Sequence, residues 1–281
     1  EVIFENGDLL AAVDKVAGIF PDKSGFSRAE DTCDKIYFSH NNISLFCLCM
    51  PICFGCLLLI IPRFYKMFNR DNGLGAAAIL NNATDAPGKE KGIYIGKTDL
   101  PLSEAGKAQL KELYETHEYP KVQKVYTSPL ERAVQSAEIL FPDRELTEVD
   151  DLREMDFGIF EGLKAEDLVN LDSYKKWLKG GLDNPPPNGE SLRNMMVRCY
   201  TALNAIILDM MNEGVTHAGV MTHSGILMNM MSCFGLPKMK PMEFACPVGH
   251  GYEIMVTAQM WQQSYCFEIL GKIPGYQAVG Y

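Results

Sequence analysis

From about residue 73 onward, short apolar segments alternate with longer amphipathic ones. The apolar segments predict strands at Ala76–Leu80, Val122–Tyr126, Ala218–Thr222 and Tyr252–Val256. The amphipathic segments predict helices at Glu104–Thr116 (with Ser103 as N-cap), Leu130–Leu140, Leu192–Met211 and Ile226–Phe234. Strands that alternate with helices favour a mostly parallel sheet covered on both faces. We therefore expect a three-layer α/β sandwich.

The N-terminal quarter has a different pattern and divides the chain into three predicted parts. Residues 1–42 carry no recognisable motif, residues 43–72 form an apolar segment with a linker, and residues 73–281 hold the α/β domain. The run Ile43–Ile61 has no charged side chain, and its 19 residues are just enough to cross a bilayer as a helix. The alternative is a buried hairpin in a soluble N-terminal module, because Pro51 interrupts the run.

The charges around this run predict its orientation if it spans a membrane. Acidic residues precede it, whereas Arg63, Lys66 and Arg70 follow it. Positive charge gathers on the cytoplasmic side of membrane helices, so the α/β domain is expected in the cytoplasm. Four of the nine cysteines lie inside the run, in a C-x-C-x₃-C-x₂-C pattern. Without interleaved histidines or carboxylates, buried or palmitoylated thiols are favoured over a metal site.

Composition narrows the range of partners. The hydrophobic fraction is 47%, the charged fraction 22% and the net charge −10. A folded domain is expected, and non-specific nucleic-acid binding is not, since no overall basic field attracts phosphate backbones. An anionic small substrate must then be held by a local positive pocket, for which Arg132 is the best candidate.

Three segments carry the candidate chemistry: Thr127–Arg132, Leu152–Gly158 and Val220–Gly225. They supply a cation, a carboxyl group and an imidazole. The first and third follow predicted strands, and ligands bind beyond the carboxyl ends of strands in such sheets. These groups suit a phosphoryl group, because they offer positive charge for its oxygens and an acid for its leaving group. No metal or organic cofactor is expected.

Five ordered motifs resemble those of the histidine phosphatase superfamily, which includes phosphoglycerate mutases and alpha-ribazole phosphatase-like enzymes. They are Tyr94–Ser103 with Gly106, Ser128–Arg132, Leu152–Gly162, Pro187–Ser191 and Thr222–His223, within a match over about residues 75–270. The chain is most similar to the short phosphatases. Gly189 follows Gly162 by only 27 positions, which leaves no room for the large insertion of the mutases.

The resemblance implies a role for each site residue. Arg132 would grip phosphoryl oxygens through its planar fork, and Glu154 would protonate the leaving oxygen. His223 would donate a hydrogen bond to the transferring group. Asp156 and Glu161 are expected to be structural. The remaining predicted substrate-binding residues are Asn82, Thr84, Thr98 and Ser224.

The first family motif, Arg-His-Gly, is missing. Alignment through Thr84 places Leu80, Asn81 and Asn82 on its three positions, and a register one residue later also puts asparagine at the nucleophile's position. An amide nitrogen is no nucleophile, because its lone pair is delocalised into the carbonyl. We therefore expect an impaired phosphomonoesterase acting on a small phosphorylated metabolite. Two alternatives stay open: a non-catalytic phosphoester-binding or scaffold protein, and replacement of the segment around residues 73–83 by unrelated sequence.

Overall fold

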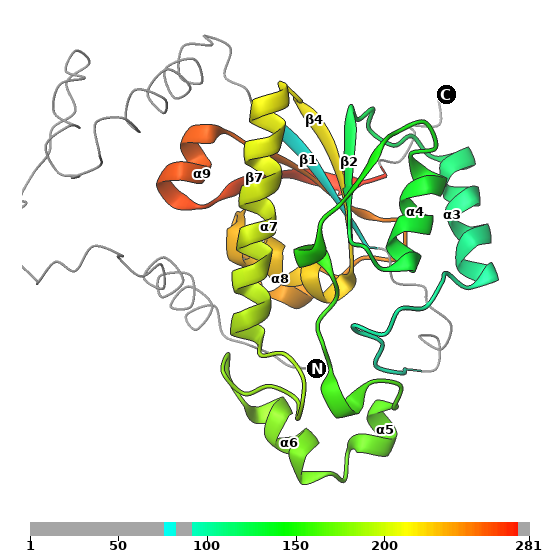
Figure 1. Ribbon diagram of the computed structural model, residues 1–281, viewed down its shortest axis with the longest axis vertical. Coiled ribbons are helices and arrows are strands. Elements are labelled where there is room, and N and C mark those ends of the chain that lie inside the picture. Colours follow the sequence, from blue (N-terminus) through cyan, green and yellow to red (C-terminus); the bar gives the residue numbers. More distant parts are fainter. Residues whose placement is uncertain (1–75, 83–91, 275–281) are drawn as a thin grey trace, which may run out of the picture. The chain divides into compact units, whose positions relative to one another are not determined.

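The computed structural model describes residues 76–82 and 92–274. Their strands form one sheet in the order β3-β2-β4-β1-β6-β7-β5 (Figure 1). Strands β3, β2, β4 and β1 are parallel to one another, and β6 is antiparallel to both of its neighbours, β1 and β7. The strand bounds are Ala76–Asn82 (β1), Lys124–Thr127 (β2), Leu146–Glu148 (β3), His217–Thr222 (β4), Gly235–Leu236 (β5), Gly251–Val256 (β6) and Phe267–Ile273 (β7).

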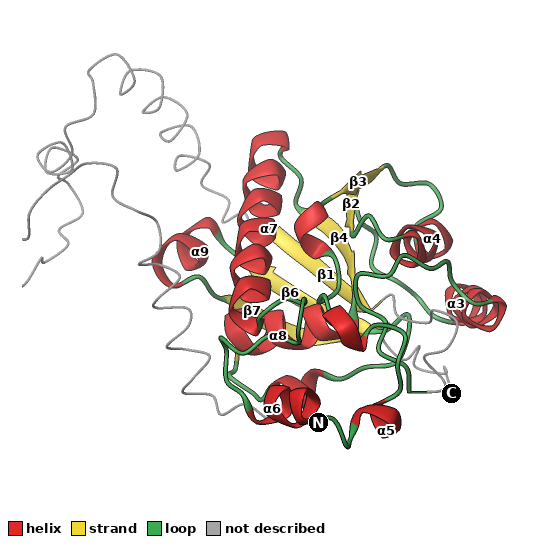
Figure 2. Cartoon of the chain, turned by 60° about the horizontal axis from the view of Figure 1, so that its bottom comes forward, coloured by secondary structure: helices red, strands yellow, loops and turns green. Residues whose placement is uncertain are grey.

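Helices cover both faces of the sheet, as the sequence predicts (Figure 2). Along β2, Val125 packs with one apolar cluster and Tyr126 with the other, because successive side chains of a strand point to opposite faces. The Val125 cluster holds α3 (Glu104–Thr116) and α4 (Glu131–Leu140). The Tyr126 cluster holds α7 (Leu192–Glu213) and α8 (Ser224–Phe234). The three-layer α/β prediction is confirmed.

Local capping explains where the helices begin and end. Ser103 accepts a hydrogen bond from Gly106 N at 3.0 Å, so α3 has the predicted bounds and the predicted N-cap. Helix α7 runs two residues beyond its prediction and is terminated by the next residue, Gly214, whose φ of 72° breaks the helix. Helix α8 starts two residues before its prediction, because the extended residue His223 forms its N-cap.

Between β3 and α7 the chain forms a small helical region. It contains two 3₁₀ turns, η3 (Asp150–Leu152) and η4 (Gly158–Phe160), and the helices α5 (Ala165–Leu168) and α6 (Asp172–Lys179). Its helices α5 and α6 lie below the sheet in Figure 1, whereas η3 packs against α7. Its rings pack around one another and around Tyr94, whose hydroxyl lies 2.7 Å from the Tyr174 hydroxyl. These aromatic contacts attach the region to the segment just before Gly96.

Several short or polar elements were not predicted, namely β3, β5, β7, α5, α6 and α9 (Ala258–Ser264). Among the described residues, no helix is long and apolar enough to cross a membrane. The predicted span Ile43–Ile61 lies outside them, as do residues 1–42 and the predicted boundary at residue 73. Of the cysteines that the structure describes, Cys199, Cys233 and Cys266 are free thiols.

Candidate functional site

Three neighbouring parallel strands end at the same edge of the sheet. In the ladders, Asn81 of β1 and Thr127 of β2 both pair with Met221 of β4, and Asn82 pairs with Thr222. The backbone that follows each strand therefore starts from one small area. Asn81 and Asn82 are at the carboxyl end of β1, directly beside the strand that leads into His223. This convergence is the one that the sequence predicts for an α/β sheet.

Arg132 lies in the first turn of α4 and is only 1% exposed. Its Nη1 donates to the carbonyl of Thr98 at 2.8 Å, and its Nη2 donates to the carbonyl of Gly96 at 2.7 Å. Within the described residues, no carboxylate forms an ion pair with it. Burial lowers the pKa of Arg132, and the charges of Glu154, Asp99 and Glu161 oppose that shift. A buried cation held by neutral carbonyls is chemically suited to an anion, because it lacks a counter-charge in contact.

Glu154 follows η3 and is buried, with its carboxylate held by backbone donors. Oε1 accepts from the amide of Met155 at 2.9 Å, and Oε2 accepts from the amide of Gly225 at 3.0 Å. Gly225 is in the first turn of α8, so the carboxylate lies at the positive end of that helix. A side chain at Gly225 would come within 2.6 Å of Oε1, which shows how closely the two segments approach.

His223 is fully buried between β4 and α8. Its Nε2 lies 2.8 Å from Oγ of Ser128, which is also fully buried. Ser128 belongs to the turn that leads into α4 and Arg132. This hydrogen bond therefore ties the imidazole to the guanidinium-bearing segment. Together with the Glu154–Gly225 contact, it brings the three predicted chemical segments into one site.

The sequence interpretation did not identify Arg198, a residue of α7 that organises the Glu154 segment. Its Nε and Nη2 contact both carboxylate oxygens of Glu190 at 2.8 and 2.9 Å. Its N–H groups also donate to the carbonyls of Asp151, Arg153 and Glu154. Burial opposes the charge of Arg198, but the bond to Glu190 raises its pKa. The signal in the sequence was a basic residue eight positions after the motif glutamate Glu190.

The other predicted residues take different places. The Thr98 side chain is exposed, and its hydroxyl donates to Oε2 of Glu161 at 2.6 Å while its carbonyl accepts from Arg132. Ser224 is the first residue of α8, next to His223. Thr84 lies outside the described residues, and only the backbone of Asn81 and Asn82 is described. Asp156 and Glu161, expected to be structural, bind Lys97 and the loop around it.

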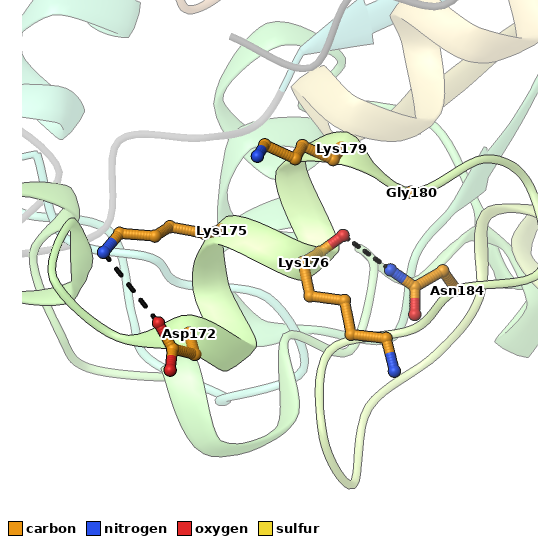
Figure 3. A pocket seen from close by; sticks show the side chains of 6 residues that line it. All are labelled: Asp172, Lys175, Lys176, Lys179, Gly180 and Asn184. Atoms are coloured by element: carbon orange, nitrogen blue, oxygen red, sulfur yellow. Dashed lines mark hydrogen bonds and ion pairs between the residues drawn. The ribbon is translucent and has the colours of Figure 1, made fainter.

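A hollow of about 540 Å³ lies beside α6, lined by Asp172, Lys175, Lys176, Lys179, Gly180 and Asn184 (Figure 3). The ammonium groups of Lys175 and Lys176 point away from each other. Lys175 is directed at Asp172, 3.9 Å away. Because these charges do not converge on one point, the hollow lacks the geometry of the Arg132 site. Across residues 76–82 and 92–274, no group of three or more His, Cys, Asp or Glu side chains could hold a metal ion.

Fold and site thus define an α/β domain with a buried cation, carboxylate and imidazole at the carboxyl ends of its parallel strands. A family model described as histidine phosphatase superfamily (branch 1) matches residues 83–265. That match covers more than half of the chain. The chain therefore belongs to the histidine phosphatase superfamily.

Among curated relatives, the chain is 32% identical over 143 residues to phosphoglycerate mutase-like protein 4 of Arabidopsis thaliana. It is 29% identical over 140 residues to adenosylcobalamin/alpha-ribazole phosphatase of Salmonella typhimurium. These matches cover 47% and 48% of this chain, but only 59% and 68% of the respective relatives.

Solved structures show the same fold. The alpha-ribazole phosphatase from Shigella flexneri superposes with a TM-score of 0.58 at 19% identity, over 69% of this chain and 95% of that one. The phosphoglycerate mutase from Bacillus anthracis gives 0.57 at 16% identity, over 70% and 92%. At such identities the likeness concerns the fold alone.

Proposed function

We propose that this protein binds the phosphate group of a small phosphorylated metabolite in the Arg132 site and is a histidine-phosphatase-type phosphomonoesterase. The observation that carries the proposal is the buried guanidinium of Arg132, which no described carboxylate contacts. Such a group gains most from a dianion that can take two of its N–H donors at once. Family membership and the phosphatase among the curated relatives support the same reaction class.

In this proposal each side chain has a defined task. Arg132 holds the phosphoryl oxygens, and His223, fixed by Ser128, donates a hydrogen bond to them. Glu154 protonates the leaving oxygen as general acid. Asn82, Thr84 and Ser224 complete the anion site, whereas Thr98 contributes through the carbonyl that holds Arg132.

The proposed phosphatase lacks the histidine that serves as the nucleophile in this family. Asn81 is the second-last residue of the central strand β1, beside β4, where the family's histidine is expected, and a carboxamide cannot form a phosphoenzyme. We propose that activity is impaired for this reason. The alternative is a phosphoester-binding or scaffold pseudoenzyme. The family match begins directly after Asn82, which agrees with an altered first motif. This start is compatible with an impaired phosphatase and with a pseudoenzyme.

The first test compares the full chain with Arg132→Ala and His223→Ala. We expect calorimetry to show that Arg132→Ala binds inorganic phosphate at least about tenfold more weakly, since a lost charged hydrogen bond costs about 1.5–3 kcal/mol. Arg144→Ala, an exposed arginine, is the control. Hydrolysis of p-nitrophenyl phosphate that disappears in both site variants would exclude the pseudoenzyme. Unchanged phosphate binding in Arg132→Ala would disprove the proposal.

The second test restores the missing motif in the variant Leu80→Arg, Asn81→His, Asn82→Gly. If Arg132, Glu154 and His223 are competent, p-nitrophenyl phosphate hydrolysis should rise by several powers of ten, because catalytic groups that act as a unit fail together. Asn81→His alone restores only the nucleophile, and its activity is compared with that of the triple variant. No gain in a folded triple variant would mean that the site lacks more than the first motif.

A further inference from the structure

The carboxylate of Glu161 is the centre of a hydrogen-bond cluster next to Arg132. Its Oε1 accepts from the amides of Lys97 and Phe157 at 3.1 and 3.0 Å. Its Oε2 accepts from the amide of Gly96 at 3.1 Å and from the Thr98 hydroxyl at 2.6 Å. Three of these four donors belong to residues 96–98. Since all four favour a charged acceptor, Glu161 fixes this loop strongly.

The same loop supplies both acceptors for Arg132. The carbonyl of Gly96 accepts from Nη2, and the carbonyl of Thr98 accepts from Nη1. Residues 96–98 therefore donate hydrogen bonds to Glu161 and accept hydrogen bonds from Arg132. The loop has little freedom to shift, because a Cβ at Gly96 would lie 1.9 Å from the carbonyl oxygen of Met155. The position of the guanidinium is therefore set by Glu161 through the loop.

This indirect arrangement has an electrostatic consequence. A carboxylate in contact with Arg132 would compete with a phosphate for the guanidinium. Glu161 forms no ion pair with Arg132, although its charge raises the pKa of that arginine. The neutral carbonyls take two of the five N–H donors of Arg132, and the others are not used by any described residue.

We propose that Glu161 is a positioning residue: it orients Arg132 for phosphate through the Gly96–Thr98 loop without neutralising it. This inference rests on the proposed phosphate site and goes beyond it by assigning a role to a residue that touches neither phosphate nor Arg132. Orientation matters because a guanidinium binds two oxygens only when its fork is correctly aimed.

The test measures inorganic phosphate binding to the full chain by calorimetry, well below the melting temperature. In Glu161→Gln the amide nitrogen faces two of the four donors, so about two hydrogen bonds are lost. We expect phosphate affinity to fall about tenfold, the equivalent of about 1.4 kcal/mol. Glu166→Gln is the matched control, because Glu166 is an exposed residue of α5 whose ion pair with Lys164 lies at the surface. It should bind phosphate as the unaltered chain does.

A double-mutant cycle separates positioning from general destabilisation. If Glu161 acts through Arg132, then the variant Arg132→Ala/Glu161→Gln should bind phosphate within about twofold of Arg132→Ala alone. A further tenfold loss in the double variant would overturn the inference. So would unchanged affinity in Glu161→Gln while Arg132→Ala loses binding. If the unaltered chain does not bind phosphate, or if Arg132→Ala binds it as tightly as the unaltered chain does, both proposals fail.

Thr98 provides a milder variant in case Glu161→Gln does not fold. Thr98→Val removes one hydrogen bond to Glu161 but keeps the carbonyl that binds Arg132. We expect phosphate affinity to fall about threefold, and Thr98→Ser, which keeps the hydroxyl, to restore it. Equal affinities in Thr98→Val and Thr98→Ser would contradict the positioning role.

Discussion

At the scale of single residues, Gly96 shows how little space separates the loop that holds Arg132 from the segment that holds Glu154. A methyl group there would lie 1.9 Å from the Met155 carbonyl oxygen and 2.5 Å from Oε1 of Glu161. Because the nearest of these atoms is backbone, Gly96→Ala must displace the loop. We predict that it lowers the free energy of unfolding by about 2–3 kcal/mol, as measured by urea denaturation.

Gly181→Ala is the matched control for this prediction. Gly181 is exposed, and a Cβ added to it meets no atom within 4 Å. Its stability should stay within about 0.5 kcal/mol of the unaltered chain. If the two alanine variants were equally stable, the close approach at Gly96 would have no energetic importance.

The sequence predicted the residues with distinctive chemistry better than those that position them. Arg132, Glu154 and His223 stand in short ordered motifs, and the structure brings their segments together. Arg198 stands in none of these motifs, and three of its partners are backbone carbonyls that carry no sequence signal, so only its spacing of eight positions from Glu190 pointed to it. The same holds for the four donors of Glu161, three of which are backbone amides.

At the scale of elements, helix α4 is capped by a residue from a distant segment. Its own N-cap, Leu130, provides no side-chain hydrogen bond. Instead Oδ1 of Asp99 accepts from the amide of Glu131 at 2.7 Å. We predict that Asp99→Ala lowers the free energy of unfolding by about 1 kcal/mol, the usual value of a lost cap. Asp99→Asn keeps an oxygen acceptor and should lose clearly less; equal losses in urea denaturation would contradict the capping role.

Element prediction succeeded where apolar periodicity and capping agree, and failed where contacts far along the chain decide. Helix α3 has both a Ser103 cap and a regular apolar face, so its bounds are the predicted ones. Strand β7 contains Gly271 and exposed residues, and it exists because β6 pairs with it. Strand β5 has two residues, which is too short for any alternation to be visible.

At the scale of the whole molecule, the apolar layer that contains α7 and α8 buries several weakly acidic side chains in their neutral form. Cys199 of α7 is fully buried, and burial raises the pKa of its thiol from 9.0 to about 12. Burial likewise raises the pKa of Tyr252 in β6 from 10.0 to about 12, and that of the Cys233 thiol. All three belong to the apolar cluster that includes the buried faces of α7 and α8.

These shifts predict an alkaline loss of stability. Above pH 9 an unfolded Cys199 releases its proton while the folded one keeps it until about pH 12, so the unfolded chain binds fewer protons and stability falls as pH rises. One such group contributes up to about 1.4 kcal/mol per pH unit in this window. Urea denaturation under reducing conditions at pH 8 and 10.5 should show a smaller fall for Cys199→Ala than for the unaltered chain. Cys266→Ala, at a partly exposed site, is the control and should keep the full fall. Identical slopes in the Cys199 and Cys266 variants would mean that other groups govern the alkaline limit of this fold.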